Sequence, residues 1–308
     1  GSWFGDVQAR ELDSHTAAVK AGAPRWSARA KLDAKSAASR KIYFKNGTAL
    51  SEFTWDDLTT ALKANFQDLC ASPAKLTQCA TLSTSNKTTV NGGAELVAYL
   101  RGDRTKEAAA TNATAPLFRE RKSVLGDIIN SKPVHVGKPP FGYTDAGYAA
   151  FKTSQVNRKK VVYVGANVIG DVGGAVIALD AATGEELWAY VPTAVMPSLY
   201  KLADVKYGSN TSQPHTYFVD GKTVQGDVYI NGAWKTILVG GLNKGGRAYY
   251  ALDVTDPDAP GALWEFTDDN LGLTYSDPVI SKLADGTWTV AFGSGYNNVS
   301  PGDGKGRL

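Results

Sequence analysis

One unit of sequence recurs along this chain and limits the folds open to it. A short apolar strand ends in Leu-Asp, a polar turn follows, and a second strand carries a tryptophan. One copy is GGAVIALDAATGEELWAYVP at 173–192, a second lies at 245–266, and a third, looser copy lies at 5–28. Asp, Thr and Gly bend a chain at little steric cost, so each copy is typical of a β-hairpin. Because an isolated hairpin is only marginally stable, these hairpins must pack on further strands.

Further strands recur before the hairpins. The apolar segments VVYVGAN (161–167), TILVGGLN (236–243) and TVAFGSGYN (289–297) each precede a Gly-rich link, and Ser-x-Pro-Val occurs in both 129–136 and 274–281. Four short strands closing on a tryptophan are typical of a β-propeller blade. We therefore predict a mainly β fold, a partial propeller with blade tryptophans Trp26, Trp188 and Trp264. Trp188 and Trp264 are expected on outermost strands, packed between blades. With about three blades against the usual minimum of about four, we expect an open array.

The segment 29–128 interrupts the blade pattern. Apolar residues at helical spacing predict helices over 54–70 and 93–103, with Gly102 ending the second. Cys70 and Cys79 lie in a stretch rich in Thr, Ser and Asn, which favours a solvent-facing disulfide over two reduced thiols. We divide the chain into a propeller hairpin (1–28), a partly helical insertion with the Cys70–Cys79 loop (29–128), and propeller blades (129–308). The last of these blades is expected to be truncated.

Composition argues against several classes of function. The 33 Lys and Arg nearly balance the 30 Asp and Glu, which gives no support for nucleic-acid binding. No apolar run reaches the roughly 18–20 residues of a membrane span. The 3 histidines are widely separated, the two cysteines are not vicinal, and no acids are paired at a spacing that would share a proton. We therefore predict no zinc site and no catalytic residues: the chain is expected not to be an enzyme and to act through its surface.

Several blocks of sequence, in a fixed order, resemble one known family. They are YLRGDR (99–104), FRERKSVLGDIINSKPVHVG (118–137), HTYFVDG (215–221), DVYINGAWKTILVGGLNKGGRAYYALDVTDP (227–257) and SDPVISKLADGTWTVAFGSGYN (276–297). Together they are similar to the C-terminal propeller of the PilC/PilY-type adhesins of bacterial type IV pili. The repeated hairpin also resembles the tryptophan-docking motif of quinoprotein-like propellers.

The resemblance implies a protein of the periplasm and then of the cell surface, at the pilus tip or outer membrane. Such proteins support pilus assembly, surface attachment, twitching motility and virulence, so the expected partners are minor pilins and a host or abiotic surface ligand. The family often carries a calcium loop, but no such loop occurs here, and calcium is expected only in the full-length protein. The nearest candidate ligands, Asp253, Asp256 and Asp258, fall in a hairpin turn, where turn chemistry is the alternative.

Two features are candidates for adhesion. Arg101-Gly102-Asp103 could engage an integrin if exposed, or Gly102 could simply end a helix. The long loops 71–93, 138–158 and 192–215 are predicted to form a contact surface, because tyrosine combines a large contact area with a polar tip. Their tyrosines could instead pin their own loops; those singled out are Tyr143, Tyr148, Tyr200 and Tyr207.

Fold alone does not decide function, and two alternatives to the adhesin stay open. One is a periplasmic or outer-membrane assembly scaffold built on a propeller. The other is a pyrroloquinoline-quinone dehydrogenase, which needs a cofactor on the propeller axis, a calcium ion beside it and an Asp base.

Overall fold

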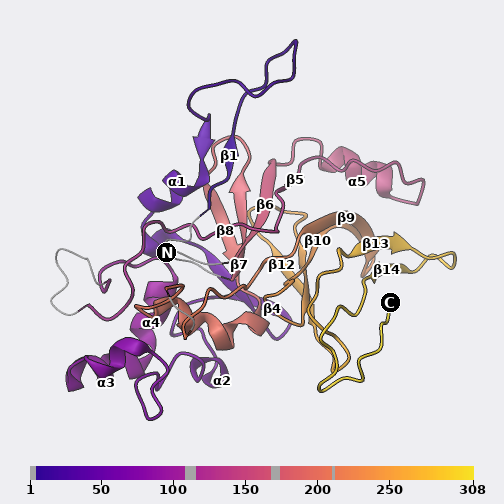
Figure 1. The fold of residues 1–308 in the computed structure, drawn as a ribbon. Coiled ribbons are helices and arrows are strands. Elements are labelled where there is room, and N and C mark those ends of the chain that lie inside the picture. The colour runs from indigo at the N-terminus through magenta and orange to yellow at the C-terminus, as the bar shows by residue number, and fades with distance from the viewer. Residues whose placement is uncertain (1–4, 108–115, 168–173, 210–211) are drawn as a thin grey trace.

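Two antiparallel meanders of four strands form the centre of the molecule (Figure 1). A computed structural model describes residues 5–107, 116–167, 174–209 and 212–308. The first meander joins β5 (Val134–Val136), β6 (Val161–Ala166), β7 (Ala175–Asp180) and β8 (Glu186–Tyr190). The second joins β9 (Thr223–Ile230), β10 (Ala233–Gly241), β11 (Tyr249–Asp253) and β12 (Gly261–Phe266). The prediction of a mainly β, propeller-type chain is confirmed by this strand order.

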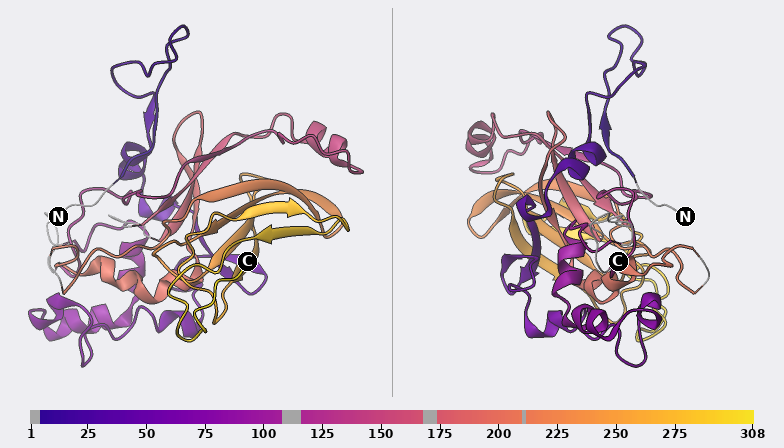
Figure 2. Two further views of the ribbon diagram at one scale, coloured as in Figure 1. Left: turned by 45° about the vertical axis from the view of Figure 1, so that its right-hand side comes forward. Right: turned by 90° about the vertical axis from the view of Figure 1, so that its left-hand side faces the viewer.

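Two shorter antiparallel pairs flank the meanders. β13 (Val279–Lys282) pairs with β14 (Trp288–Ala291), and β1 (Gln8–Ala9) pairs with β2 (Trp26–Ser27). Between β1 and β2, residues 10–25 form an arm that stands away from the body of the molecule (Figures 1 and 2). The first meander and the insertion share one large hydrophobic core, while a smaller core lies between the second meander and the β13–β14 pair.

The tryptophans link successive hairpins across the blades. Trp188 on β8 is buried, and its indole Nε1 donates to the carbonyl oxygen of Pro257 in the β11–β12 turn, at 2.8 Å. Trp26 makes the equivalent contact, donating to the carbonyl oxygen of Ala181 in the β7–β8 turn at 3.1 Å. Its ring covers Gly184, which has φ +74° and where a Cβ atom would lie 2.6 Å from the indole. Only glycine fits this turn without strain.

The first meander is wider than a blade, because the insertion adds a hairpin to it. β3 (Ile42–Asn46) pairs in parallel with β8, and β4 (Ala49–Glu52) pairs antiparallel with β3. The prediction that Trp188 lies on an outermost strand is therefore wrong, whereas Trp264 does lie on the outermost strand of the second meander. A buried ion pair supports the added hairpin: Arg40 Nη2 lies 2.5 Å from Glu186 Oε2 at the start of β8.

The insertion also carries most of the helices. These are α1 (Ala28–Ala34), η1 (Ala37–Ser39), α2 (Thr60–Lys63), η2 (Thr77–Ala80), α3 (Thr84–Gly92) and α4 (Ala94–Leu100), where η marks a 3-10 helix. The helix predicted over 93–103 corresponds to α4, and Gly102 follows it with φ +109°. The helix predicted over 54–70 is wrong, since only α2 is helical there. Thr54 and Thr59 each bond a backbone N–H three residues on, which divides the segment into separate short turns.

Candidate functional site

The Arg-Gly-Asp tripeptide at 101–103 is held against the fold. Arg101 Nη1 donates to the carbonyl oxygen of Phe53 at 3.0 Å, and Nη2 donates to that of Arg40 at 2.9 Å. Burial lowers the pKa of the Arg101 guanidinium, which stays charged nonetheless. Asp103 is half-buried, and its carboxylate accepts the backbone N–H two residues on. This geometry favours the structural alternative, and a role of the tripeptide in adhesion stays a prediction.

The acidic candidates for calcium lie in the β11–β12 turn and have partners within the protein. Asp253 Oδ2 lies 2.5 Å from the ammonium group of Lys235, and Asp258 Oδ1 lies 2.5 Å from that of Lys159. Asp256 accepts the backbone N–H of Asp258 at 3.0 Å. Among the described residues, no group of three or more His, Cys, Asp or Glu side chains could hold a metal ion. Turn chemistry and ion pairing therefore account for these acids.

Cys70 and Cys79 are joined by a disulfide within the insertion. The solvent-facing position predicted for it is wrong, because Cys79 is only 2% exposed and Cys70 packs against the same core. The side chain of Asn91, near the end of α3, accepts the backbone N–H of Cys70 at 2.7 Å. The disulfide thus holds the segment before α3 against the core and offers little contact surface.

The three segments predicted as contact loops are partly helical. The first, 71–93, contains η2 and α3; the second, 138–158, contains α5 (Tyr148–Ser154); and the third, 192–215, contains η3 (Thr193–Ala203), with 210–211 outside the described residues. Tyr148 is 1% exposed and Tyr207 3% exposed, so neither can belong to a contact surface. For these two the pinning alternative holds. Tyr143 and Tyr200 are half-buried.

Residues 137–160, which we call the strap, connect β5 to β6 and extend over the next blade (Figure 2). The Tyr148 hydroxyl donates to Asp227 Oδ2 on β9 at 2.7 Å, and Trp234 Nε1 on β10 donates to the carbonyl oxygen of Ala146 at 2.9 Å. Burial, together with the hydrogen bond to Asp227, raises the pKa of Tyr148. An ion pair of Asp145 with Lys282 on β13 fixes the strap to the β13–β14 pair as well.

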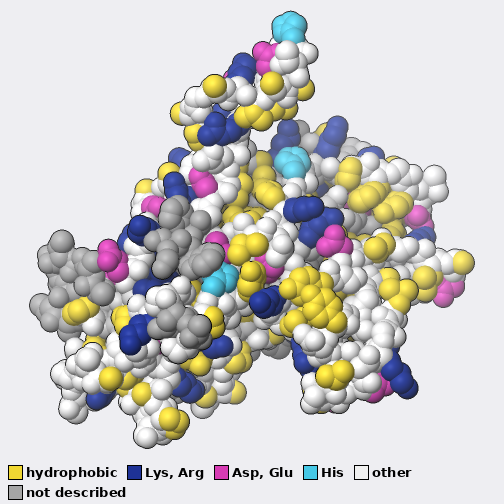
Figure 3. Space-filling model, viewed as in Figure 1, with side chains coloured by type: hydrophobic (Ala, Val, Ile, Leu, Met, Phe, Trp, Pro, Cys, Tyr) yellow, Lys and Arg dark blue, Asp and Glu magenta, His cyan; other side chains and the backbone are white. Residues whose placement is uncertain are grey.

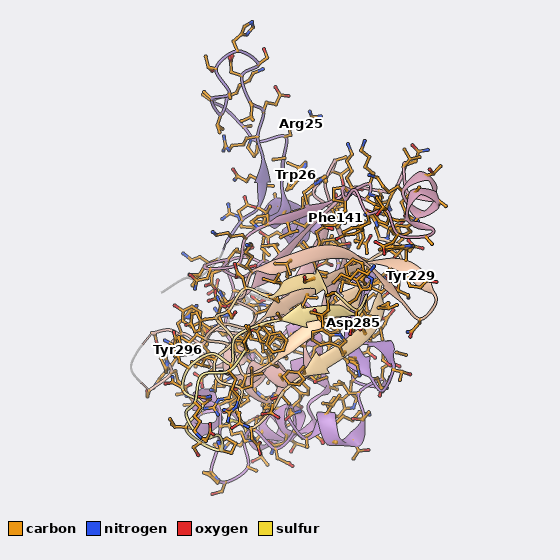
Figure 4. The ribbon with its side chains drawn as sticks, turned by 90° about the vertical axis from the view of Figure 1, so that its right-hand side faces the viewer. Arg25, Trp26, Phe141, Tyr229, Asp285 and Tyr296 are labelled. Carbon is orange, nitrogen blue, oxygen red and sulfur yellow. A yellow bond between two sulfur atoms is a disulfide. The ribbon has the colours of Figure 1, made fainter. Side chains whose placement is uncertain are left out.

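The far end of the strap carries an aromatic cluster. Tyr143 lies between two nearly parallel rings: Phe141, with centroids 5.2 Å apart, and Trp234, with centroids 5.7 Å apart. Tyr229 borders Trp234 and is 47% exposed. Figure 4 shows Phe141 and Tyr229 at the same end of the molecule. Exposed aromatic rings with polar tips suit recognition of a partner.

A cavity of about 490 Å³ lies at the root of the strap. It is lined by His135, Val136, Gly137, Lys138, Pro140, Val156, Arg158, Lys160 and Gln225, and thus by no Asp or Glu among the described residues. In Figure 3, lysine and arginine side chains gather around a histidine over β5 and β6. Sequence reasoning missed this cavity, because its basic residues converge only when the strap folds back. The run Arg158-Lys159-Lys160 was the one signal in the sequence.

The chain is similar to a known family of proteins. The family model of the PilY1 beta-propeller domain matches residues 125–308. A type IV pilus biogenesis factor PilY1 homolog of Xylella fastidiosa is 38% identical over 97% of this chain and 22% of its own length. Type IV pilus biogenesis factor PilY1 of Pseudomonas aeruginosa (strain UCBPP-PA14) is 35% identical over 96% of this chain and 24% of its own length. The chain therefore spans less than a quarter of these relatives.

A solved structure is also similar. The crystal structure of the Pseudomonas aeruginosa PilY1 C-terminal domain has 33% sequence identity and a TM-score of 0.42, over 53% of this chain and 32% of that one. The described residues include no helix with the length and apolar character needed to cross a membrane.

Proposed function

This chain belongs to the PilY1 β-propeller family, and from that premise we propose that it is part of a type IV pilus biogenesis factor acting as an adhesin at the pilus tip. The named relatives are type IV pilus biogenesis factors, and the similarity covers nearly all of this chain. The proposal places the protein in the periplasm and then at the cell surface. Its partners would be minor pilins on one side and a host or abiotic surface on the other.

The observation that carries the adhesin role is the strap. It is pinned to three successive sets of strands and holds Tyr143 within an aromatic cluster that borders the exposed Tyr229. A rigid scaffold that presents a segment between strands is the usual arrangement for recognition. We propose no catalytic centre and no resident cofactor for this chain, and any calcium-dependent step is assigned to other parts of the full-length protein.

The test separates attachment from pilus assembly in bacteria that produce the full-length protein. Phe141→Ser with Tyr229→Ser removes the accessible rings of the strap end. Val205→Ser serves as the control, since Val205 is also exposed, at 42%, but lies in the segment after η3. We expect the double variant to keep normal amounts of surface pilin but to attach several-fold less to epithelial cells or polystyrene. Normal piliation and attachment after deletion of the whole protein would refute the proposed function.

A further inference from the structure

The cavity at the root of the strap is positively charged and without a counter-charge in its lining. Lys138 and Lys160 are exposed, and their ammonium groups have no ion-pair partner among the described residues. Arg158 adds a third, fixed charge: its Nε donates to the carbonyl oxygen of Gly137 at 2.8 Å, and its Nη1 to Thr236 Oγ1 at 2.7 Å. Unpaired cations in a concave site concentrate anions there.

The cavity also contains a buried hydrogen-bond acceptor that has no donor. Gln225 on β9 lines the cavity, and its side-chain Oε1 is buried with no hydrogen-bond partner among the described residues. A buried acceptor without a partner costs free energy, which a ligand with a hydroxyl or N–H donor recovers. His135, on β5, also lines the cavity and can donate or accept a hydrogen bond. The cavity thus offers cations for an acid and an acceptor for a hydroxyl.

The charged surface continues beyond this cavity. A neighbouring cavity of about 670 Å³ shares His135 and the unpaired Lys160 with it and is also lined by Arg25 and Lys159, which form ion pairs with Glu11 and Asp258. Asp180 is the acidic residue of that lining, and its carboxylate already accepts two backbone N–H groups of its own turn. A chain of anionic units therefore fits the two cavities better than a single small anion does.

We propose that this pair of cavities binds an acidic polysaccharide, with the carboxylate of one sugar residue between Lys138 and Lys160 and one of its hydroxyl groups donating to Gln225. A volume of about 490 Å³ suits a sugar residue and exceeds what one acidic amino-acid side chain fills. The inference names a ligand class for the adhesin and so rests on the proposed function. Direct binding by the purified chain tests it separately.

The experiment titrates the purified chain with hexagalacturonate by calorimetry, at low and at physiological salt. Its methyl ester lacks the charge, and hexaglutamate carries the charge without the sugar. The variant is Lys138→Gln with Lys160→Gln, and the matched control is Lys41→Gln with Lys122→Gln, two exposed lysines outside both cavities. Gln225→Leu tests the hydroxyl contact, with its thermal unfolding measured in parallel.

We expect saturable binding of hexagalacturonate that weakens with salt, and weakens at least about tenfold in the cavity variant, because charged hydrogen bonds are lost. The control variant should stay within about twofold of the unaltered chain, and the methyl ester should bind about tenfold more weakly. Equal affinity of the cavity and control variants overturns the site, and equal affinity for hexaglutamate overturns the sugar assignment. No saturable binding below about 1 mM overturns the inference entirely. Normal piliation and attachment after deletion of the whole protein, with binding by the purified chain intact, overturns the proposed function alone.

Discussion

Replacing Trp188 by phenylalanine tests whether tryptophan docking couples the blades. The side chain is 1% exposed, and its indole N–H donates to the carbonyl oxygen of Pro257, 69 residues away, at 2.8 Å. Phenylalanine keeps an aromatic ring on β8 but removes this donor and part of the buried volume. The lost hydrogen bond costs about 1 kcal/mol, and the residual cavity costs a similar amount, so we expect unfolding free energy to fall by about 2 kcal/mol.

Trp264→Phe is the matched control, because it changes the same position of the repeat. Trp264 is half-buried, and its indole N–H makes no hydrogen bond within the described part of the chain. We expect it to cost less than about 1 kcal/mol. Urea unfolding followed by circular dichroism measures both variants, and an unchanged slope shows that the denatured states are comparable. Equal losses for the two variants would refute the docking argument, because Trp264 has no such hydrogen bond to lose.

Four further changes have defined outcomes. Cys70→Ser with Cys79→Ala should lower the unfolding free energy by about 2.5 kcal/mol, because the bond closes a loop with a sequence separation of 9; reduction of the unaltered chain before urea unfolding should match it. Glu186→Gln leaves its buried arginine partner without a counter-ion and should cost about 3 kcal/mol by the same assay. Tyr148→Phe removes a donor from a fully buried carboxylate and should cost about 2 kcal/mol, with the melting temperature lowered accordingly. Burial raises the pKa of Tyr249 to about 12, so the folded state holds this proton more tightly than the unfolded state; stability should be constant below about pH 10 and fall towards pH 12, as thermal melts across that range would show.

The blades could be predicted because their signals are local and repeated. Each hairpin has its own turn residues and its own alternation, so strands β6, β10 and β14 lie where their sequences place them. The groups that accept the tryptophan N–H donors could not be predicted from local sequence. The carbonyl groups that receive Trp26 and Trp188 belong to ordinary turn residues, Ala181 and Pro257, and backbone acceptors have no signature in a sequence.

Prediction failed where tertiary contacts decide the local structure. The apolar spacing over 54–70 is helical, yet Thr54 and Thr59 cap two separate short turns. Phe66 and Leu69 follow these turns and are buried in the core. The parallel pairing of β3 with β8 joins segments about 150 residues apart, and no periodicity reports such a contact. The strap is marked in the sequence by its length, and its role in recognition stays a prediction. Its short helix α5 is below the length at which periodicity is informative.

The two surfaces of the strap share one internal support, which is the reason to regard it as a recognition element. At its root, Arg158 donates to Thr236 Oγ1, and that hydroxyl donates to Asp227 Oδ1 at 2.6 Å. The other oxygen of the same carboxylate receives the Tyr148 hydroxyl, next to the aromatic cluster. Asp227 is fully buried, and these two donors satisfy both oxygens of its carboxylate. The cationic cavity and the aromatic end are therefore held in fixed relative positions, and a rigid site loses less conformational entropy when it binds a ligand.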